Sequence, residues 1–315
     1  MLRTAICDLF GIEHPIIQGG MAHVATAELV AAVSNAGGLG IIGCGYYQAE
    51  WVRQQIRLTK QKTSRPFGIN VPLTSPYVKE VIEVILREGV PIITTGTASP
   101  RPYILRFKQA GMKIMPVIAT VSAAKHMEEA GVDAVVAEGM ESGGHIGEVT
   151  TMALVPQVVD TVKIPVVAAG GFADGRGLAA ALALGAQGIQ MGTRFVASTE
   201  CVANPKYKQK ILEADDRATT VTGYSTGLPL RALKNSLTEQ YHALEQAGVS
   251  KEELELFAQG RMHLGLIEGD TEEGSLLAGQ IAGMIKDIKP VRAIIEDTIA
   301  QVEKIIASLN NFRKG

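Results

Sequence analysis

The sequence of 315 residues is poor in cysteine, poor in aromatic residues and has no excess of charge of either sign. Its three cysteines, Cys7, Cys44 and Cys201, are odd in number, far apart and without a C-x-x-C pair. This pattern is typical of reduced thiols, and it excludes a disulfide framework or a cysteine-based zinc site; no metal site is predicted. The 30 basic and 32 acidic residues give a formal net charge of −2, which excludes general binding to a nucleic-acid backbone.

Long hydrophobic runs are also absent. The longest apolar stretches, residues 164–169 and 178–184, are much shorter than the roughly 20 residues that span a bilayer, so no transmembrane helix is expected. Residues 1–11 contain Arg3 and Asp8 and lack the apolar core of a signal peptide, which favours a cytoplasmic location. The chain does have 46% hydrophobic residues and 34 glycines, enough for one large core or two ordinary ones. A disordered or fibrous chain is excluded.

Short runs of β-branched and apolar residues recur along the first two thirds of the chain and predict eight buried strands. These runs are residues 15–18, 39–42, 67–73, 92–95, 114–119, 134–137, 165–169 and 188–191. Between them lie helical stretches with apolar residues three and four positions apart. Eight apolar strands that alternate with helices predict an α/β fold with a closed (β/α)8 TIM barrel. A doubly wound open sheet is the alternative.

The pattern changes after Met191. Residues 199–285 contain many helix formers and few strand-like runs, which predicts an inserted, mainly helical segment that could act as a lid. The barrel then occupies residues 1–198. Residues 286–315 form a C-terminal helix that packs back on the barrel, with an amphipathic stretch at 291–309.

Glycines cluster directly after several of the predicted strands. In a parallel barrel the active site forms at the carboxyl ends of the strands, so these positions are candidates for ligand contact. The segments are 18–22, 94–96, 138–147, 169–175 and 190–195, with Asn70 inside the third strand. The segments after the seventh and eighth strands are where this fold usually binds phosphate through backbone N–H groups, so a phosphorylated ligand is predicted. The alternative is that these glycines only permit tight turns.

His145 is the candidate catalytic residue. It lies in a glycine-rich loop after the sixth strand, where an imidazole has room to reach a substrate and to donate a hydrogen bond or transfer a proton. Glu138 and Glu141 flank it. These carboxylates either orient the imidazole or cap the loop, and the sequence leaves both interpretations open.

Several motifs together resemble one family. They are Gln18-Gly19-Gly20-Met21, the run 36–42, Gly68-Ile69-Asn70, the run 137–145 that ends in His145, and Gln190-Met191-Gly192-Thr193-Arg194. In combination they are similar to the nitronate monooxygenase superfamily, and within it to the flavin-dependent enoyl-acyl-carrier-protein reductase II branch. The resemblance extends over nearly the whole chain, including the segments 223–235 and 279–283.

The resemblance implies an FMN-dependent enzyme that takes a hydride from NADH or NADPH and reduces trans-2-enoyl thioesters carried by acyl carrier protein, in fatty-acid elongation. It implies a homodimer, and His145 matches the family's active-site histidine. The phosphate of FMN would lie over Gly170, Gly171, Gly192 and Thr193, and the ring system near Gly20, Met21, Ala22 and Asn70. The remaining residues expected to contact the cofactor are Thr95, Glu138, Gly143, Gly144, Ala169, Gln190 and Met191.

Three alternatives accompany this interpretation. A nitronate monooxygenase would use the same barrel, with FMN reacting with dioxygen. An inosinate-dehydrogenase-like enzyme needs a nucleophilic cysteine, and none of the three cysteines lies in the loop after the sixth strand. A non-catalytic flavin-binding protein would not need His145.

Two further hypotheses concern the insertion. The lysines Lys206, Lys208 and Lys210 form a basic stretch that is a candidate docking site for the acidic carrier protein, with an ordinary solvated surface as the alternative. Arg231 and Asn235 are candidates for substrate contacts.

Overall fold

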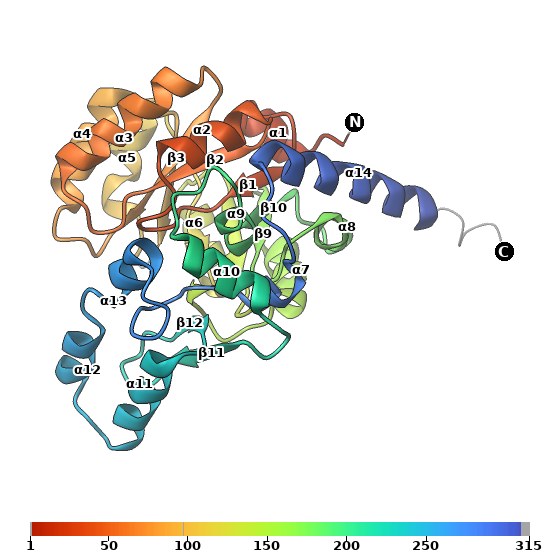
Figure 1. The fold of residues 1–315 in the computed structure, drawn as a ribbon. Helices are drawn as coiled ribbons and strands as arrows, with labels where there is room; N and C mark the ends of the chain where they lie inside the picture. The colour runs from red at the N-terminus through yellow and green to blue at the C-terminus, as the bar shows by residue number, and fades with distance from the viewer. Residues whose placement is uncertain (1, 97, 310–315) are drawn as a thin grey trace.

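The computed structural model describes residues 2–96 and 98–309, and its main sheet is the predicted barrel (Figure 1). The strands of this sheet follow the order β5-β4-β3-β2-β1-β10-β9-β7-β6, and every pairing within it is parallel. They are β1 (Ile16–Gln18), β2 (Leu39–Gly43), β3 (Phe67–Pro72), β4 (Ile92–Gly96), β5 (Lys113–Ile114), β6 (Val117–Ile118), β7 (Val135–Glu138), β9 (Val166–Ala169) and β10 (Gly188–Met191). All eight predicted strand regions are confirmed.

Strands β5 and β6 are two pieces of the predicted fifth strand. Pro116 interrupts the strand because proline has no N–H to donate to a ladder. The pairing continues across the break, since Met115 N donates to Ile93 O (2.9 Å) on one side and Pro116 O accepts from Val136 N (2.9 Å) on the other. The two ends of the strand order are therefore adjacent pieces of one strand, and the sheet is closed. The open-sheet alternative is wrong.

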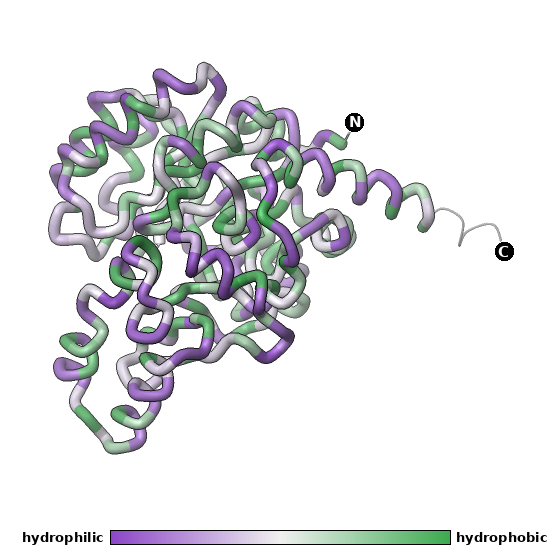
Figure 2. The backbone as a smooth tube through the Cα atoms, in the orientation of Figure 1, coloured by the Kyte–Doolittle hydropathy of each residue, from purple (hydrophilic) through white to green (hydrophobic). Residues whose placement is uncertain are grey.

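Helices surround the barrel, and the first of them, α1, contributes to its inner core. They are α1 (Ala5–Phe10), α2 (Ala27–Asn35), α3 (Ala49–Lys62), α4 (Val78–Glu88), η1 (Arg101–Tyr103), α5 (Ile104–Gln109), α6 (Val121–Glu129), α7 (Thr151–Thr161), α8 (Gly175–Ala183), α9 (Thr193–Val196) and α14 (Val291–Leu309). Hydrophilic and hydrophobic residues alternate along helix α14 (Figure 2). The helix packs on α8 and α2. This confirms the predicted amphipathic helix at 291–309. Within the described residues, the structure contains no helix with the length and apolar character needed to cross a membrane.

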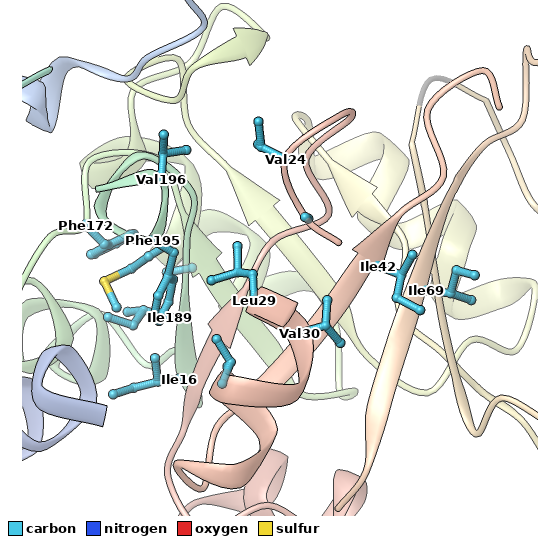
Figure 3. Close-up of a cluster of buried hydrophobic side chains, with 14 of the residues drawn as sticks. Ile16, Val24, Leu29, Val30, Ile42, Ile69, Phe172, Ile189, Phe195 and Val196 are labelled. Atoms are coloured by element: carbon cyan, nitrogen blue, oxygen red, sulfur yellow. The ribbon is translucent and has the colours of Figure 1, made fainter. Parts of the chain in front are cut away.

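The core has two layers because successive strand residues point to opposite faces. Ile17, Ile41 and Val136 belong to the inner cluster, which fills the barrel and is joined by Ile6 and Phe10 of α1. The outer cluster lies between strands and helices. Figure 3 shows part of it: Ile16, Val24, Leu29, Val30, Ile42, Ile69, Phe172, Ile189, Phe195 and Val196. Side chains thus fill the barrel below the level of the strand ends, and a ligand has room only at the carboxyl end.

The insertion, residues 199–285, is not purely helical. Its helices are α10 (Pro205–Glu213), α11 (Ser236–Gln246), α12 (Lys251–Ala258), α13 (Arg261–His263), η2 (Leu264–Glu268) and η3 (Gln280–Met284). It also contains the antiparallel hairpin β11 (Thr219–Thr222) and β12 (Leu230–Leu233), which joins β8 (Gly144–His145) in a second sheet of order β11-β12-β8. The sequence did not predict this hairpin, which reaches the candidate site.

Candidate active site

A cavity of about 490 Å³ opens at the carboxyl ends of the barrel strands. Its lining includes the predicted residues Gly20, Met21, Ala22, Asn70, Glu138, Gly143, Gly144, His145, Ala169, Gly170, Gly171, Gln190, Met191, Gly192 and Thr193. The structure therefore brings together segments at the ends of five barrel strands, namely β1, β3, β7, β9 and β10.

Thr95 is the predicted site residue that does not line the cavity. It is fully buried, and its hydroxyl has no hydrogen-bond partner among the described residues. Strand geometry explains the difference, because adjacent residues of β4 point to opposite faces. Thr94 lies opposite Asn70 in the sheet and accepts a hydrogen bond from Asn70 Nδ2 (2.8 Å), so Thr94 is the threonine that fixes a lining side chain.

The glycines after β9 have the left-handed backbone that L side chains rarely adopt, with φ of +85° at Gly170 and +88° at Gly171. A Cβ at Gly170 would lie 2.6 Å from Gly139 O, so this position needs glycine for close packing of two loops. A Cβ at Gly171 would have its nearest neighbour, Glu141 Cβ, at 3.6 Å. A Cβ at Gly171 would therefore make only an ordinary van der Waals contact, and Gly171 itself lines the cavity.

His145 is held on β8, opposite Leu230 of β12, and its exposed surface faces the cavity. The enclosure of the ring lowers the pKa of His145, because burial disfavours the charged form. The lowered pKa favours the neutral imidazole, which can donate one hydrogen bond to a group in the cavity.

Glu141 caps helix α7 and does not orient the imidazole. Its carboxylate oxygens accept hydrogen bonds from Thr151 N (2.9 and 3.1 Å) and from Thr151 Oγ1 (2.9 Å). The Thr151 hydroxyl also lies 2.7 Å from Gly170 O. For Glu141 the structure decides between the two interpretations in favour of capping, and the cap ties the loop of His145 to the glycines after β9.

Glu138 ends β7 and has its carboxyl group enclosed at the wall of the cavity. Burial raises the pKa of Glu138 to about 7, and the neighbouring Ser142 hydroxyl offsets only part of this. A carboxyl group with a raised pKa binds its proton more tightly in the folded than in the unfolded protein. It therefore stabilises the fold at a pH below its ordinary pKa of 4.5, and this stabilisation is lost as the pH rises towards 7.

We therefore expect Glu138→Gln to reduce the pH dependence of stability in the flavin-free protein. Between pH 5 and pH 8 the wild type should lose about 2 kcal/mol of unfolding free energy that the variant keeps, because the amide cannot ionise. Urea unfolding at both pH values measures this. Glu129→Gln, at an exposed position of α6, is the control and should follow the wild type. Parallel curves for wild type and Glu138→Gln would contradict the prediction.

The insertion supplies lining residues that the sequence analysis did not identify, namely Tyr207, Leu228, Met262, Leu266, Leu277, Gly279 and Ile281. Met262 and Leu266 lie four positions apart on one helical face, a spacing that could have indicated them. Arg231 and Asn235 do not line the cavity. Asn235 instead caps α11 by accepting a hydrogen bond from Thr238 N (3.1 Å).

The basic stretch on α10 is not one surface, and the docking prediction is wrong for Lys208. Lys208 is 7% exposed, and its Nζ donates to Ser198 O (2.7 Å) and Cys201 O (2.6 Å). Lys210 forms an ion pair with Glu272 (3.4 Å), and Lys206 is exposed. Residues two positions apart on a helix point to different sides, so Lys208 does not share a face with Lys206 and Lys210.

The three cysteines are free and buried, and none lines the cavity. Burial raises the pKa of the Cys44 and Cys201 thiols, which disfavours the thiolate needed for attack. This argues against an inosinate-dehydrogenase-like mechanism.

Comparisons with known proteins agree with this geometry. The structure of FabK from Thermotoga maritima superposes with a TM-score of 0.97 at 48% identity, covering 99% of this chain and 100% of that chain. Nitroalkane oxidase from Streptomyces ansochromogenes gives a TM-score of 0.86 at 30% identity, covering 97% and 100%. The (3aS,4S,5R,7aS)-5-hydroxy-7a-methyl-1-oxo-octahydro-1H-indene-4-carboxyl-CoA dehydrogenase of Mycobacterium tuberculosis is 36% identical over 95% of both chains. The family model described as nitronate monooxygenase matches residues 3–82 and 74–301. This chain belongs to the nitronate monooxygenase family.

Proposed function

We propose that this protein is an FMN-dependent enoyl-acyl-carrier-protein reductase that uses NADH or NADPH. The observation that carries the proposal is the 48% identity to FabK, an enoyl-acyl-carrier-protein reductase II, along essentially the full length of both chains. The cavity supports it, because a neutral His145 lies beside glycine-rich loops and apolar side chains of the insertion.

The cavity residues fit FMN. The volume of about 490 Å³ is within the range of roughly 300 to 1,000 Å³ that cofactor sites occupy. Close backbone approach is built into the wall: a Cβ at Gly20 would lie 2.2 Å from Asn70 Cβ, and one at Gly143 would lie 2.6 Å from Ala278 C. Asn70, Glu138, Gln190 and Thr193 supply polar groups for a ring edge and a ribityl chain, and the glycine amides after β9 and β10 suit a phosphate.

When bound, FMN supplies hydride transfer between the nicotinamide donor and the β-carbon of the enoyl thioester. His145 would donate a hydrogen bond to the thioester carbonyl and stabilise the negative charge that develops on its oxygen. A single donor of this kind is usually worth about 3 to 4 kcal/mol. The apolar side chains Met262, Leu266 and Leu277 would exclude water and bind the acyl chain. The proton for the α-carbon comes from solvent or from a group in the cavity.

Oxidation of alkyl nitronates is the second candidate function, because nitroalkane oxidase from Streptomyces ansochromogenes has the same fold at 30% identity. The CoA dehydrogenase relative instead favours thioester chemistry, since its name specifies a carboxyl-CoA substrate.

The purified protein should show a flavin absorbance band that bleaches on addition of NADH or NADPH under nitrogen. It should then reduce crotonyl thioesters to butyryl thioesters with consumption of the nicotinamide. Consumption of dioxygen with an alkyl nitronate, without reaction with crotonyl thioesters, would replace the reductase proposal with the monooxygenase. Absence of flavin would contradict both.

We make three further proposals, on the carrier of the substrate, on the location and oligomeric state of the enzyme, and on the division of the chain. The substrate is carried by acyl carrier protein, the enzyme is a cytoplasmic homodimer, and the barrel, insertion and C-terminal helix form the three parts of each chain. A comparison of carrier-protein and coenzyme-A thioesters tests the first, and analytical ultracentrifugation tests the dimer.

A further inference from the structure

The loop that carries His145, residues 138–147, is held from two sides. On the barrel side, Gly139 N donates to Ala169 O (2.9 Å) and Met140 N donates to Val149 O (2.9 Å). On the insertion side, β12 pairs with β8, and Gln280 N donates to Glu141 O (2.9 Å). The position of the imidazole therefore depends on how the insertion contacts this loop.

Arg231 of β12 makes the side-chain contact between the insertion and this loop. Its Nε and Nη2 both donate to Met140 O (3.2 and 3.1 Å), and its Nη1 donates to Thr219 Oγ1 (3.1 Å) on the neighbouring strand. Among the described residues, no other side chain of the insertion donates or accepts a hydrogen bond to residues 138–147. Met140 is thus held on both sides, with its N–H bonded to Val149 just before α7 and its carbonyl bonded to Arg231 of the insertion.

Arg231 is an unusual residue for this place. It is 5% exposed and forms no ion pair with a carboxylate among the described residues. Burial lowers its pKa, although Tyr224 and Glu141 partly oppose this. Burying a charge without a paired carboxylate is costly. What the guanidinium gains is a fixed, planar pair of charge-assisted hydrogen bonds to one carbonyl.

The register of the second sheet connects this carbonyl to the catalytic group. Arg231 lies opposite Gly144, and Leu230 lies opposite His145. Gly143 packs so closely on the insertion that a Cβ would lie 2.7 Å from Gly279 N. A shift of Met140 therefore moves the chain that leads to His145, while Arg231 itself does not line the cavity and has no direct path to the substrate.

We propose that Arg231 is a positioning residue, which fixes His145 for the reaction by clamping the Met140 carbonyl. The proposal rests on the proposed function, because it assigns the effect to the thioester reaction. A displacement of about 1 Å at a reacting group can cost about 100-fold in rate.

The test compares Arg231→Gln and Arg231→Lys in the flavin-loaded enzyme. Arg231→Gln should lower kcat for crotonyl thioester by about 10- to 100-fold with KM within about threefold, because the bound substrate is less well aligned. The flavin content and the rate of flavin bleaching by NADH should stay at the wild-type level. Arg231→Lys should recover most of kcat, since one ammonium donor can still reach Met140 O.

A double-mutant cycle with His145→Ala tests whether Arg231 acts through His145. In the His145→Ala background, Arg231→Gln should change the remaining rate by less than about twofold. Arg261→Gln is the matched control: Arg261 donates to backbone and side-chain oxygens of Glu273 within the insertion and does not contact the loop of His145. It should leave kcat unchanged.

The proposal is overturned if Arg231→Gln keeps the wild-type kcat, or if it causes the same fold loss with and without His145. If Arg231→Gln loses flavin or thermal stability, the same cycle is made with Thr219→Val, which removes the acceptor of Arg231 Nη1 and leaves the arginine in place, and its outcome decides. Wild-type enzyme without activity on enoyl thioesters overturns the proposed function instead, so the two failures are distinguishable.

Discussion

Replacing His145 by alanine is expected to slow the half-reaction with a 2-enoyl thioester by roughly 10² to 10³, because a hydrogen-bond donor to the developing oxyanion is lost. The variant should keep its FMN and should still be bleached by NADH or NADPH at a near-normal rate. His145 faces the cavity from β8, where it can act on the thioester but is not needed for the nicotinamide step. Anaerobic stopped-flow absorbance measures the two half-reactions separately.

His126→Ala is the control for this experiment, since His126 is exposed on α6. It should leave both half-reactions unchanged. The role given to His145 would be wrong if His145→Ala abolished flavin reduction by NADH or NADPH while enzyme whose flavin had been reduced beforehand still reduced the enoyl thioester. A loss of FMN from His145→Ala would instead show that the residue mainly holds the cofactor.

Gly171→Val is expected to give folded protein that is depleted of FMN and therefore inactive. The branched side chain would occupy the free space beside the glycine amides after β9, where the phosphate is expected, and it would strain a backbone with φ of +88°. The ratio of flavin absorbance to protein absorbance after purification and dialysis against excess FMN measures the effect.

A matched substitution at Gly131 distinguishes the effect of backbone strain from the effect of blocking the phosphate site. Gly131 has φ of +87°, and a Cβ there would have no neighbour within 4 Å. Gly131→Val therefore imposes similar backbone strain in a turn that does not line the cavity, and it should be destabilised while keeping its FMN. Full, tightly bound flavin in Gly171→Val would place the phosphate elsewhere.

The barrel could be predicted from the sequence because its strands are buried on both faces. Such strands are short apolar runs. In the helices between them, apolar residues recur every three to four positions, so local patterns identify both kinds of element. The same logic placed the glycine-rich segments and His145 at the carboxyl ends of the strands. In contrast, the sequence predicted Thr95 as a site residue. A local pattern identifies the strand but does not show whether Thr94 or Thr95 faces the inside of the barrel.

Only the tertiary structure decided what the insertion does. Residues 219–222 and 230–233 form strands because they pair with each other, and the second of them pairs with β8, so that Leu230 lies opposite His145. These partners are 85 positions apart in the chain, and no local propensity records such a pairing, because strand formation depends on the neighbouring strand. The burial of Lys208 and the clamp of Arg231 on Met140 have the same origin. The sequence by itself determined the barrel, the glycine loops and the candidate histidine, whereas long-range packing determined how that histidine is held.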